Sequence, residues 1–262
     1  MPSGSVTSGT CTGACRASAV IRIAAAPVAI DAPPPAPSDI AAAARAATPA
    51  GAMMTPTPPP DPIAQAHLGL LDLTRALALT DPGLAGFLGD TLDDLGPPQP
   101  PPPRPPVMGA ALAACCGLAV PRTQPVTDWV IDHADCFAWQ QSYTAADGMG
   151  ADFLAAYGWF NLVSPVGPFR SDRLRITVGY WGPGIVYPEH CHEPAEVYAV
   201  LAGAARFRSP GRPPRRVGAG ESVAHASWQV HATDLDPGPL LALIPWRGGD
   251  LMARATLGLP PM

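Results

Sequence analysis

Three potential metal ligands lie close together in the second half of the chain, where His190, His192 and Glu196 form the array H-x-H-x3-E. Residues two apart on a β-strand point to the same face, so the two histidines can reach one metal ion together. Glu193 and Pro194 form a turn-like break that lets the next strand bring the Glu196 carboxylate to the same point. Two imidazoles and a carboxylate suit Fe, Mn, Co, Ni or Zn, so the array predicts one divalent transition metal ion.

A fourth ligand has to come from elsewhere in the chain, and His231 is the candidate. It lies on a strand that follows a turn opened by Gly220. A site with this spacing is built from two adjacent hairpins of a small barrel.

The spacing resembles that of the cupin family. The first cupin motif, G-x5-H-x-H-x3-E-x6-G, is met in full by Gly184, His190, His192, Glu196 and Gly203. The second motif, G-x5-P-x-G-x2-H-x3-N, is met only by Gly220 and His231, because Ala226, Trp228 and Leu235 stand where the family has Pro, Gly and Asn. The resemblance implies a single jelly-roll-like antiparallel β-barrel.

Two tyrosines carry a narrower resemblance, to the cupin-type dimethylsulfoniopropionate (DMSP) lyases. Tyr187 comes just before the first histidine of the array, and Tyr198 lies two residues after Glu196. The segments 225–233 and 246–250 are also similar to this family, and the likeness covers roughly residues 128–251. It implies a metal-dependent carbon–sulfur lyase that cleaves DMSP, a small zwitterion, to dimethyl sulfide and acrylate by β-elimination.

The resemblance also implies a base that removes a proton beside the substrate carboxylate while the metal holds that carboxylate. Tyr198 is favoured, because it shares a strand face with Glu196 and its hydroxyl should point at the metal. Tyr187 lies three residues before His190, so strand parity puts it on the opposite face unless Pro188 bends the chain. The family nevertheless places its equivalent in the active site. The alternative for each tyrosine is an aromatic residue that fills the barrel.

The sulfonium group needs aromatic walls, because aromatic faces attract poorly hydrated cations. Trp246 is the first candidate, and the other possible walls are Trp181, Trp228, Tyr143 and Phe207. His225 shares strand parity with His231 if the segment between them is extended. It is then expected to bind the substrate carboxylate or to support a metal ligand, and the alternative is an exposed turn.

Two other functions stay open. A cupin dioxygenase acting on a small thiol or acid would keep open positions on Fe(II) for O2, although Glu196 as a ligand differs from the three-histidine thiol dioxygenases. A non-catalytic ligand-binding cupin is the third alternative, since fold does not settle function.

Composition restricts the partners and the location. The chain has 262 residues and a net charge of −5, and all 16 of its basic residues are arginines without a basic stripe, which excludes a nucleic-acid partner. It has no apolar run of 18 residues, so no membrane span is expected.

Its six cysteines fit a reducing compartment and predict a cytoplasmic protein. An acid-free start containing Arg16 and Arg22 is compatible with an organelle transit peptide instead. Cupins often dimerise through sheet faces, so a homodimer is also considered.

The predicted fold class is mainly β, in three parts. Residues 1–60 have a Pro/Ala-rich composition typical of disorder, residues 61–164 form a helical accessory region, and residues 165–262 form the barrel. A polyproline spacer covers residues 97–106. Helices are expected from Pro62 to the Asp81-Pro82 pair and over residues 83–95, 107–118 and 126–141. Short strands are expected over residues 173–181, 197–201, 222–224, 230–233 and 240–245.

Overall fold

The computed structural model describes residues 61–260. The predictions of disorder and of a transit peptide both concern residues 1–60, which lie outside the described residues. Within residues 61–260, no helix is both long and apolar enough to cross a membrane.

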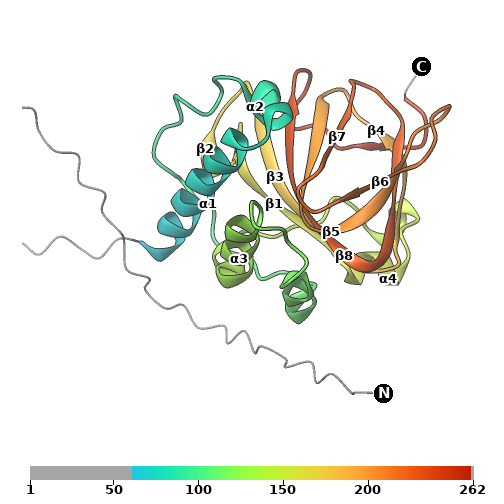
Figure 1. The fold of residues 1–262 in the computed structure, drawn as a ribbon, viewed down its shortest axis with the longest axis horizontal. Helices are drawn as coiled ribbons and strands as arrows, with labels where there is room; N and C mark the ends of the chain where they lie inside the picture. Colours follow the sequence, from blue (N-terminus) through green and yellow to red (C-terminus); the bar gives the residue numbers. More distant parts are fainter. Residues whose placement is uncertain (1–60, 261–262) are drawn as a thin grey trace, which may run out of the picture. The chain divides into compact units, whose positions relative to one another are not determined.

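Two helices precede the proline-rich segment (Figure 1). α1 (Pro62–Leu79) begins where the Asp61 carboxylate accepts a hydrogen bond from the Ile63 amide. α2 (Pro82–Leu88) begins in the same way, with Asp81 accepting from the Leu84 amide. The prediction of a helix over residues 83–95 was wrong at its end, because Gly89 at φ +55° terminates α2.

The chain between residues 107 and 141 is less helical than predicted. A 3-10 helix (Gly109–Cys115) replaces the helix expected over residues 107–118. α3 (Gln124–Asp132) stops early, because Phe137 is extended and Gln140 pairs with Trp159. Short helical turns and α4 lead from there into the sheet; their bounds are Ala134–Cys136, Ala145–Asp147 and, for α4, Ala151–Ala155.

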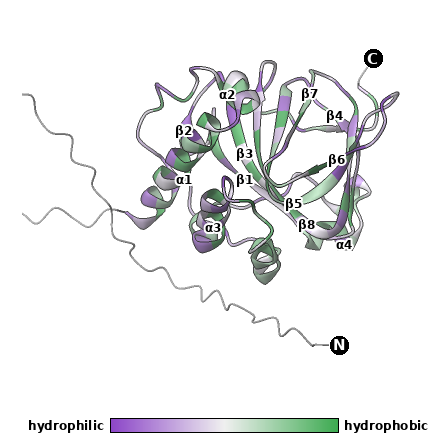
Figure 2. Cartoon of the chain, in the orientation of Figure 1, coloured by the Kyte–Doolittle hydropathy of each residue, from purple (hydrophilic) through white to green (hydrophobic). Residues whose placement is uncertain are grey.

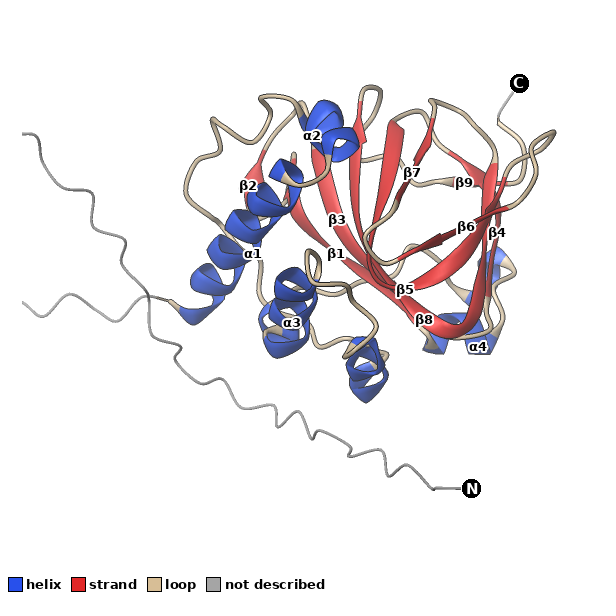
Figure 3. Ribbon diagram, viewed as in Figure 1, coloured by secondary structure: helices blue, strands red, loops and turns tan. Residues whose placement is uncertain are grey.

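Nine strands in the described part of the chain form one strongly curved sheet (Figure 3). Every pairing is antiparallel except that of β1 with β2. The long strand β8 pairs with β3, β4 and β5 and so joins the two sides of the barrel. The strands are β1 (Tyr157–Ser164), β2 (Phe169–Arg170), β3 (Arg175–Trp181), β4 (Val186–Cys191), β5 (Ala195–Arg208), β6 (Arg215–Gly218), β7 (Ser222–His225), β8 (His231–Arg247) and β9 (Thr256–Leu257).

Strand β1 lies within residues 61–164, which were expected to be an accessory helical region. It pairs with β3 along most of its length, from Tyr157↔Trp181 to Val163↔Ile176. The aromatic and β-branched residues of this segment favour a strand. The proline-rich segment 97–106 is also attached to the barrel, because the Gln99 amide donates to the Pro168 carbonyl and the Arg104 amide donates to the Phe137 carbonyl.

The two faces of the sheet carry different side chains. On β3, Arg175, Thr177 and Trp181 face the barrel interior, and Ile176 and Val178 face the helices. Figure 2 shows hydrophilic and hydrophobic residues alternating along this strand. On β8 successive residues also face opposite sides, because Leu241 and Leu243 pack in the core under the helices and Leu240, Ala242 and Ile244 pack in the barrel interior.

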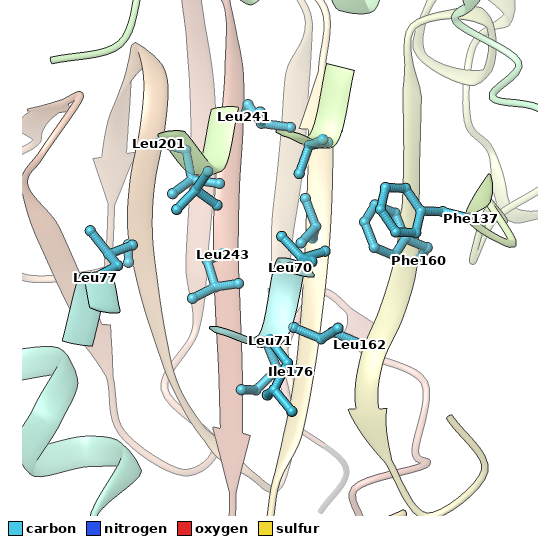
Figure 4. Packing of buried hydrophobic residues seen from close by; sticks show 14 of the residues in the cluster. Leu70, Leu71, Leu77, Phe137, Phe160, Leu162, Ile176, Leu201, Leu241 and Leu243 are labelled. Atoms are coloured by element: carbon cyan, nitrogen blue, oxygen red, sulfur yellow. The ribbon is translucent and has the colours of Figure 1, made fainter. Parts of the chain in front are cut away.

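The outward faces pack against the helices and form a hydrophobic core, here called the outer cluster. It joins side chains of α1 and α2 to the strands, as Figure 4 shows for Leu70, Leu77, Ile176, Leu201 and Leu243. Each of these is at most 4% exposed. A second, aromatic-rich core fills the barrel interior and is called the inner cluster; it includes Tyr143, Phe153, Tyr157, Trp181, Tyr187, Tyr198 and Phe207. The outer cluster therefore fixes the strands whose inner faces hold the site.

Candidate metal centre

Four side chains converge inside the barrel. His190 lies near the end of β4, His192 follows that strand, Glu196 lies at the start of β5, and His231 opens β8 opposite His190. One ligand atom from each lies within 4.8 Å of those of the others. All four residues are at most 3% exposed. The structure thus brings together the four residues that the sequence pattern proposed as ligands.

Backbone hydrogen bonds fix the orientation of the three imidazoles. Nδ1 of His190 donates to the Pro188 carbonyl, Nδ1 of His192 to the Pro194 carbonyl, and Nδ1 of His231 to the Gln229 carbonyl, each at 2.8 Å. A carbonyl oxygen can only accept, so each Nδ1 carries a proton. In the neutral ring Nε2 then presents a lone pair, which is the form that binds a metal.

The atoms at the centre of the cluster lack hydrogen bonds. Nε2 of His192 and Nε2 of His231 lie 3.2 and 2.7 Å from Glu196 Oε1, but none of these three buried atoms has a hydrogen-bond partner. Glu196 Oε2 is oriented by a hydrogen bond of 2.8 Å from the indole N–H of Trp246. Buried polar atoms without partners are costly, and a cation at this point would satisfy them. The residues therefore fit a transition metal ion.

The electrostatics of the cluster favour a bound cation. Burial disfavours the Glu196 carboxylate, yet electrostatic attraction to His192 and His231 outweighs burial and holds its pKa well below the usual value; a cation held by neutral imidazoles would supply that attraction in their place. Burial and the neighbouring His231 hold the pKa of His190 well below its usual value, so this imidazole is neutral at pH 7. The cluster offers a negative charge and a neutral nitrogen donor to one ion.

A cavity of about 240 Å³ opens beside the four candidate ligands His190, His192, Glu196 and His231, which are here called the ligand cluster. His190, His192 and Glu196 form part of its wall, and six of the other fourteen lining residues are aromatic. The aromatic lining residues are Tyr157, Trp159, Trp181, Tyr187, Tyr198 and Trp246. The volume and the lining suit a small molecule that carries both a metal-binding group and a group attracted to aromatic rings.

Both candidate tyrosines line this cavity. Tyr198 is buried beside Glu196, as strand parity predicts. Tyr187 also faces the cavity, because the β4–β8 register shifts between Tyr187 and His190 and thereby changes the parity. Its ring stacks on that of His190 at 3.9 Å, and its hydroxyl lies 2.8 Å from the hydroxyl of Tyr143.

The other predicted substrate-binding residues differ in their positions relative to the cavity. Trp246 and Trp181 line the cavity, whereas Tyr143 lies behind Tyr187 and does not. His225 is buried and stacks face to face on His231 at 4.0 Å, so it lies against a candidate ligand and not in an exposed turn. Trp228 does not line the cavity, because it lies in a turn at φ +58° with 39% of its surface exposed.

Sequence reasoning missed several cavity residues on β1 and β3. Tyr157, Trp159 and Arg175 all line the cavity. Their strands lie before the histidine array in sequence and meet it only through β8. The alternation of Arg175, Thr177 and Gly179 with apolar residues was the available signal, since polar residues on a buried strand mark its inner face.

The small antiparallel barrel and its histidine–glutamate cluster define the chain as a cupin. More narrowly, it belongs to the dimethylsulfoniopropionate lyase family, whose sequence model matches residues 99–242. The chain is 36% identical over 200 residues to the dimethylsulfoniopropionate lyase DddQ of Ruegeria pomeroyi, and the match covers 76% of this chain and 96% of that relative.

Solved structures agree with this assignment. The crystal structure of DMSP lyase DddQ from Ruegeria pomeroyi DSS-3 is similar with a TM-score of 0.67 and 36% identity, over 74% of this chain and 96% of that one. A chain from the crystal structures of the DMSP lyases RdDddP and RnDddQII has a TM-score of 0.70 and 34% identity, over 75% and 99%.

Proposed function

We propose that this protein is a carbon–sulfur lyase that cleaves DMSP to dimethyl sulfide and acrylate. One observation carries the proposal: the ligand cluster and Tyr198 share one aromatic cavity, in a chain that belongs to the DMSP lyase family. A small zwitterion with a carboxylate at one end and a sulfonium at the other matches that combination of groups.

The proposed cofactor is one divalent transition metal ion, with Fe, Mn, Zn, Co and Ni as candidates. His190, His192, Glu196 and His231 would hold it. When bound, it would act as a Lewis acid on the substrate carboxylate and make the adjacent C–H group more acidic.

Tyr198 is the proposed base. Its phenolate takes the proton from the carbon next to the carboxylate, and the C–H electrons form the new C=C bond. The C–S bond breaks with its electron pair moving to sulfur, which leaves as neutral dimethyl sulfide and needs no proton. Burial and the Glu196 carboxylate raise the pKa of Tyr198 well above its usual value. A cation held by the ligand cluster acts in the opposite direction and favours the phenolate.

The remaining aromatic wall is the proposed sulfonium site. Trp181 lies with its ring centroid 5.7 Å from that of Tyr157, 6.1 Å from that of Tyr187 and 5.8 Å from that of Tyr198. Aromatic faces attract a cation by about 0.5–2 kcal/mol each, more when water is excluded. The dimethylsulfonium would therefore be bound among these rings.

Headspace gas chromatography of the purified protein with DMSP tests the function. We expect dimethyl sulfide that disappears after chelation and returns when a single metal is added back. Tyr198→Phe should form dimethyl sulfide at least about 100-fold more slowly while it keeps its metal. If no metal restores activity, the lyase is rejected, and O2 uptake with small thiols would then test the dioxygenase alternative before a binding role is considered.

A cytoplasmic location and a homodimer stay predictions. Light scattering coupled to gel filtration measures the mass of the assembly, and fractionation of the producing cells locates the protein.

A further inference from the structure

Two arginines line the cavity, and their charges are compensated differently. Arg254 Nη2 lies 2.6 Å from Asp147 Oδ1, and its guanidinium lies 4.7 Å from the ring centroid of Tyr143. Arg175, on β3, forms no ion pair with any carboxylate in residues 61–260. Arg175 is therefore a cavity cation without an ion pair; the Asp250 carboxylate acts on it through space and raises its pKa, but no ion pair joins the two.

Arg175 is buried and held in place by neutral groups. It is 7% exposed, its Nε donates to Asn161 Oδ1 at 3.1 Å, and its Nη1 donates to the Leu251 carbonyl at 3.0 Å. Its guanidinium lies 4.8 Å from the ring centroid of Trp159 and 5.0 Å from that of Trp246. The two hydrogen bonds use Nε and Nη1, and Nη2 is the nitrogen that neither of them occupies. Burial lowers the pKa of Arg175 to about 10, so the side chain is still a cation at neutral pH.

Arg175 belongs to the same end of the barrel as the ligand cluster. It pairs with Trp246 across β3 and β8, and Trp246 pairs with Glu196 across β8 and β5. These three residues form a row on the inner face, with neighbouring strands about 4.8 Å apart. A small anion in the cavity can therefore approach Arg175 while it lies beside the ligand cluster.

We propose that Arg175 binds the carboxylate of the substrate through Nη2 and so determines the direction in which the zwitterion lies in the cavity. The inference rests on the proposed function and deepens it. A buried cation without an anion is unfavourable, and a carboxylate supplies both the charge and the hydrogen-bond acceptor. The positive charge of Arg175 repels the sulfonium. The sulfonium is therefore expected to bind among the rings of Trp181, Tyr157, Tyr187 and Tyr198. The substrate class is thus small acids with a cationic or apolar tail.

Two half-substrates separate the two ends of the molecule. 4-Methylpentanoate keeps the carboxylate and replaces the sulfonium by an isopropyl group, and the dimethyl(propyl)sulfonium ion keeps only the cationic end. Calorimetry on the full chain, with and without metal, gives the Kd of each. For Arg175→Met we expect the acid to bind roughly 10- to 100-fold more weakly in both metal states, as for the loss of a charge-assisted hydrogen bond. The sulfonium ion should bind equally well or better, which also reports a folded cavity.

Arg254→Met is the matched control, because it removes a cavity cation that Asp147 already compensates. It should change the Kd of the acid less than Arg175→Met does, and Arg175→Lys should restore part of the acid binding. An unchanged Kd of the acid in Arg175→Met, or an equal loss of both probes, would overturn the proposal.

Wild-type protein provides a second test that does not depend on how the variants fold. Phenylglyoxal modifies arginine, and 4-methylpentanoate should slow its reaction with Arg175, as read by peptide mass spectrometry. Absence of protection counts against the proposal. Dimethyl sulfide release by the wild type is measured separately, so acid binding that depends on Arg175 without lyase activity would reject the proposed function alone.

Discussion

The indole of Trp246 contacts both charged parts of the site. Its N–H donates to Glu196 Oε2, its ring stacks on His192 at 4.1 Å, and the guanidinium of Arg175 lies 5.0 Å from its centroid. The hydrogen bond to Oε2 leaves Oε1 turned toward the histidines. We therefore expect Trp246 to have two separable roles, as a donor that orients the candidate ligand Glu196 and as an aromatic surface.

Trp246→Phe separates these roles, because it removes the N–H and keeps an aromatic ring. Loss of a partner that orients a metal ligand typically weakens metal binding by about 10- to 100-fold, and we expect a loss of this size. Competition with a chromophoric chelator measures it. Trp159→Phe is the control, since that indole donates to Ser142 Oγ and not to a ligand. Equal metal affinity in the two variants would contradict the assignment.

The two tyrosines of the cavity should differ in their effect on the rate and on its pH dependence. Tyr198→Phe removes the proposed base and should lower kcat by about 10²- to 10⁴-fold. Tyr187→Phe should cost less, because the hydroxyl of Tyr187 is engaged with that of Tyr143.

The active form of the base is the phenolate, and burial raises the pKa of Tyr198. The rate of dimethyl sulfide formation by the metal-loaded protein should therefore rise as the pH rises through the pKa that Tyr198 has beside the bound metal. Tyr187→Phe should keep this rise, and its disappearance in that variant would instead make Tyr187 the base.

At the scale of elements, Gly203 shows why a cupin motif ends in glycine. It has φ +75°, and a Cβ there would overlap the carbonyl oxygen of Pro239 on the facing strand β8. The residue therefore allows both an unusual backbone conformation and a close approach of β5 to β8.

Gly203→Ala should destabilise the fold more than Gly211→Ala, measured by urea unfolding. Gly211 has φ +73° and open space where an alanine methyl group would lie, so alanine there should cost about 1–2 kcal/mol for the left-handed conformation alone. The extra loss of unfolding free energy in Gly203→Ala, compared with Gly211→Ala, measures the cost of the overlap between the alanine methyl group and Pro239. Equal losses at the two positions would show that β5 and β8 can separate without cost.

Asp81 connects α2 to the barrel. Its carboxylate caps α2 through the Leu84 amide, accepts a hydrogen bond from Ser222 of β7, and lies 3.4 Å from Arg122. Burial alone would raise the pKa of Asp81, but these hydrogen bonds and the arginine outweigh burial and lower it.

Asp81→Ala should therefore cost about 1 kcal/mol of unfolding free energy at pH 7, as for the loss of a helix cap. A depressed folded-state pKa stabilises the protein above the unfolded value of about 3.9, and that contribution is lost as the pH falls through the folded value. Urea unfolding at pH 7 and near pH 3 should thus show a smaller difference between wild type and variant at the lower pH. Asp72→Ala is the control, because Asp72 lies in an exposed pair with Arg75. If the difference in unfolding free energy between wild type and Asp81→Ala were the same at both pH values, the proposed link between the pKa of Asp81 and stability would be wrong.

The sequence predicted the family and the mainly β cupin fold, and both are confirmed. The array of His190, His192 and Glu196 could be interpreted because its spacing is local and its geometry follows from strand parity. Tyr187 could not be placed by parity, since a register shift between two strands depends on their pairing. Arg175 was missed because no known motif surrounds it in the sequence. Trp228 was proposed because of its aromatic ring, but its backbone forms an exposed turn away from the cavity. The positions that could not be predicted are those that depend on how strands far apart in the sequence pair with one another.

At the scale of the whole molecule, the family match covers residues 99–242, so residues 1–60 lie outside it. Deletion of residues 1–60 should therefore leave dimethyl sulfide formation and the Tm unchanged. Gas chromatography and calorimetry on the shortened and full chains make the comparison. Loss of soluble, folded protein on deletion would show that the segment contributes to folding.

The separation of the outer cluster from the cavity lining has a consequence for protein engineering. No residue of the outer cluster lines the cavity, although the two sets alternate along the same strands. Libraries that vary the inward positions Thr177, Trp181 and Ile244 would change the shape of the cavity and part of the inner cluster, and they would leave the outer cluster intact. Such a scaffold should tolerate directed evolution toward other small acids, and most of its inactive variants should still be recovered as folded protein.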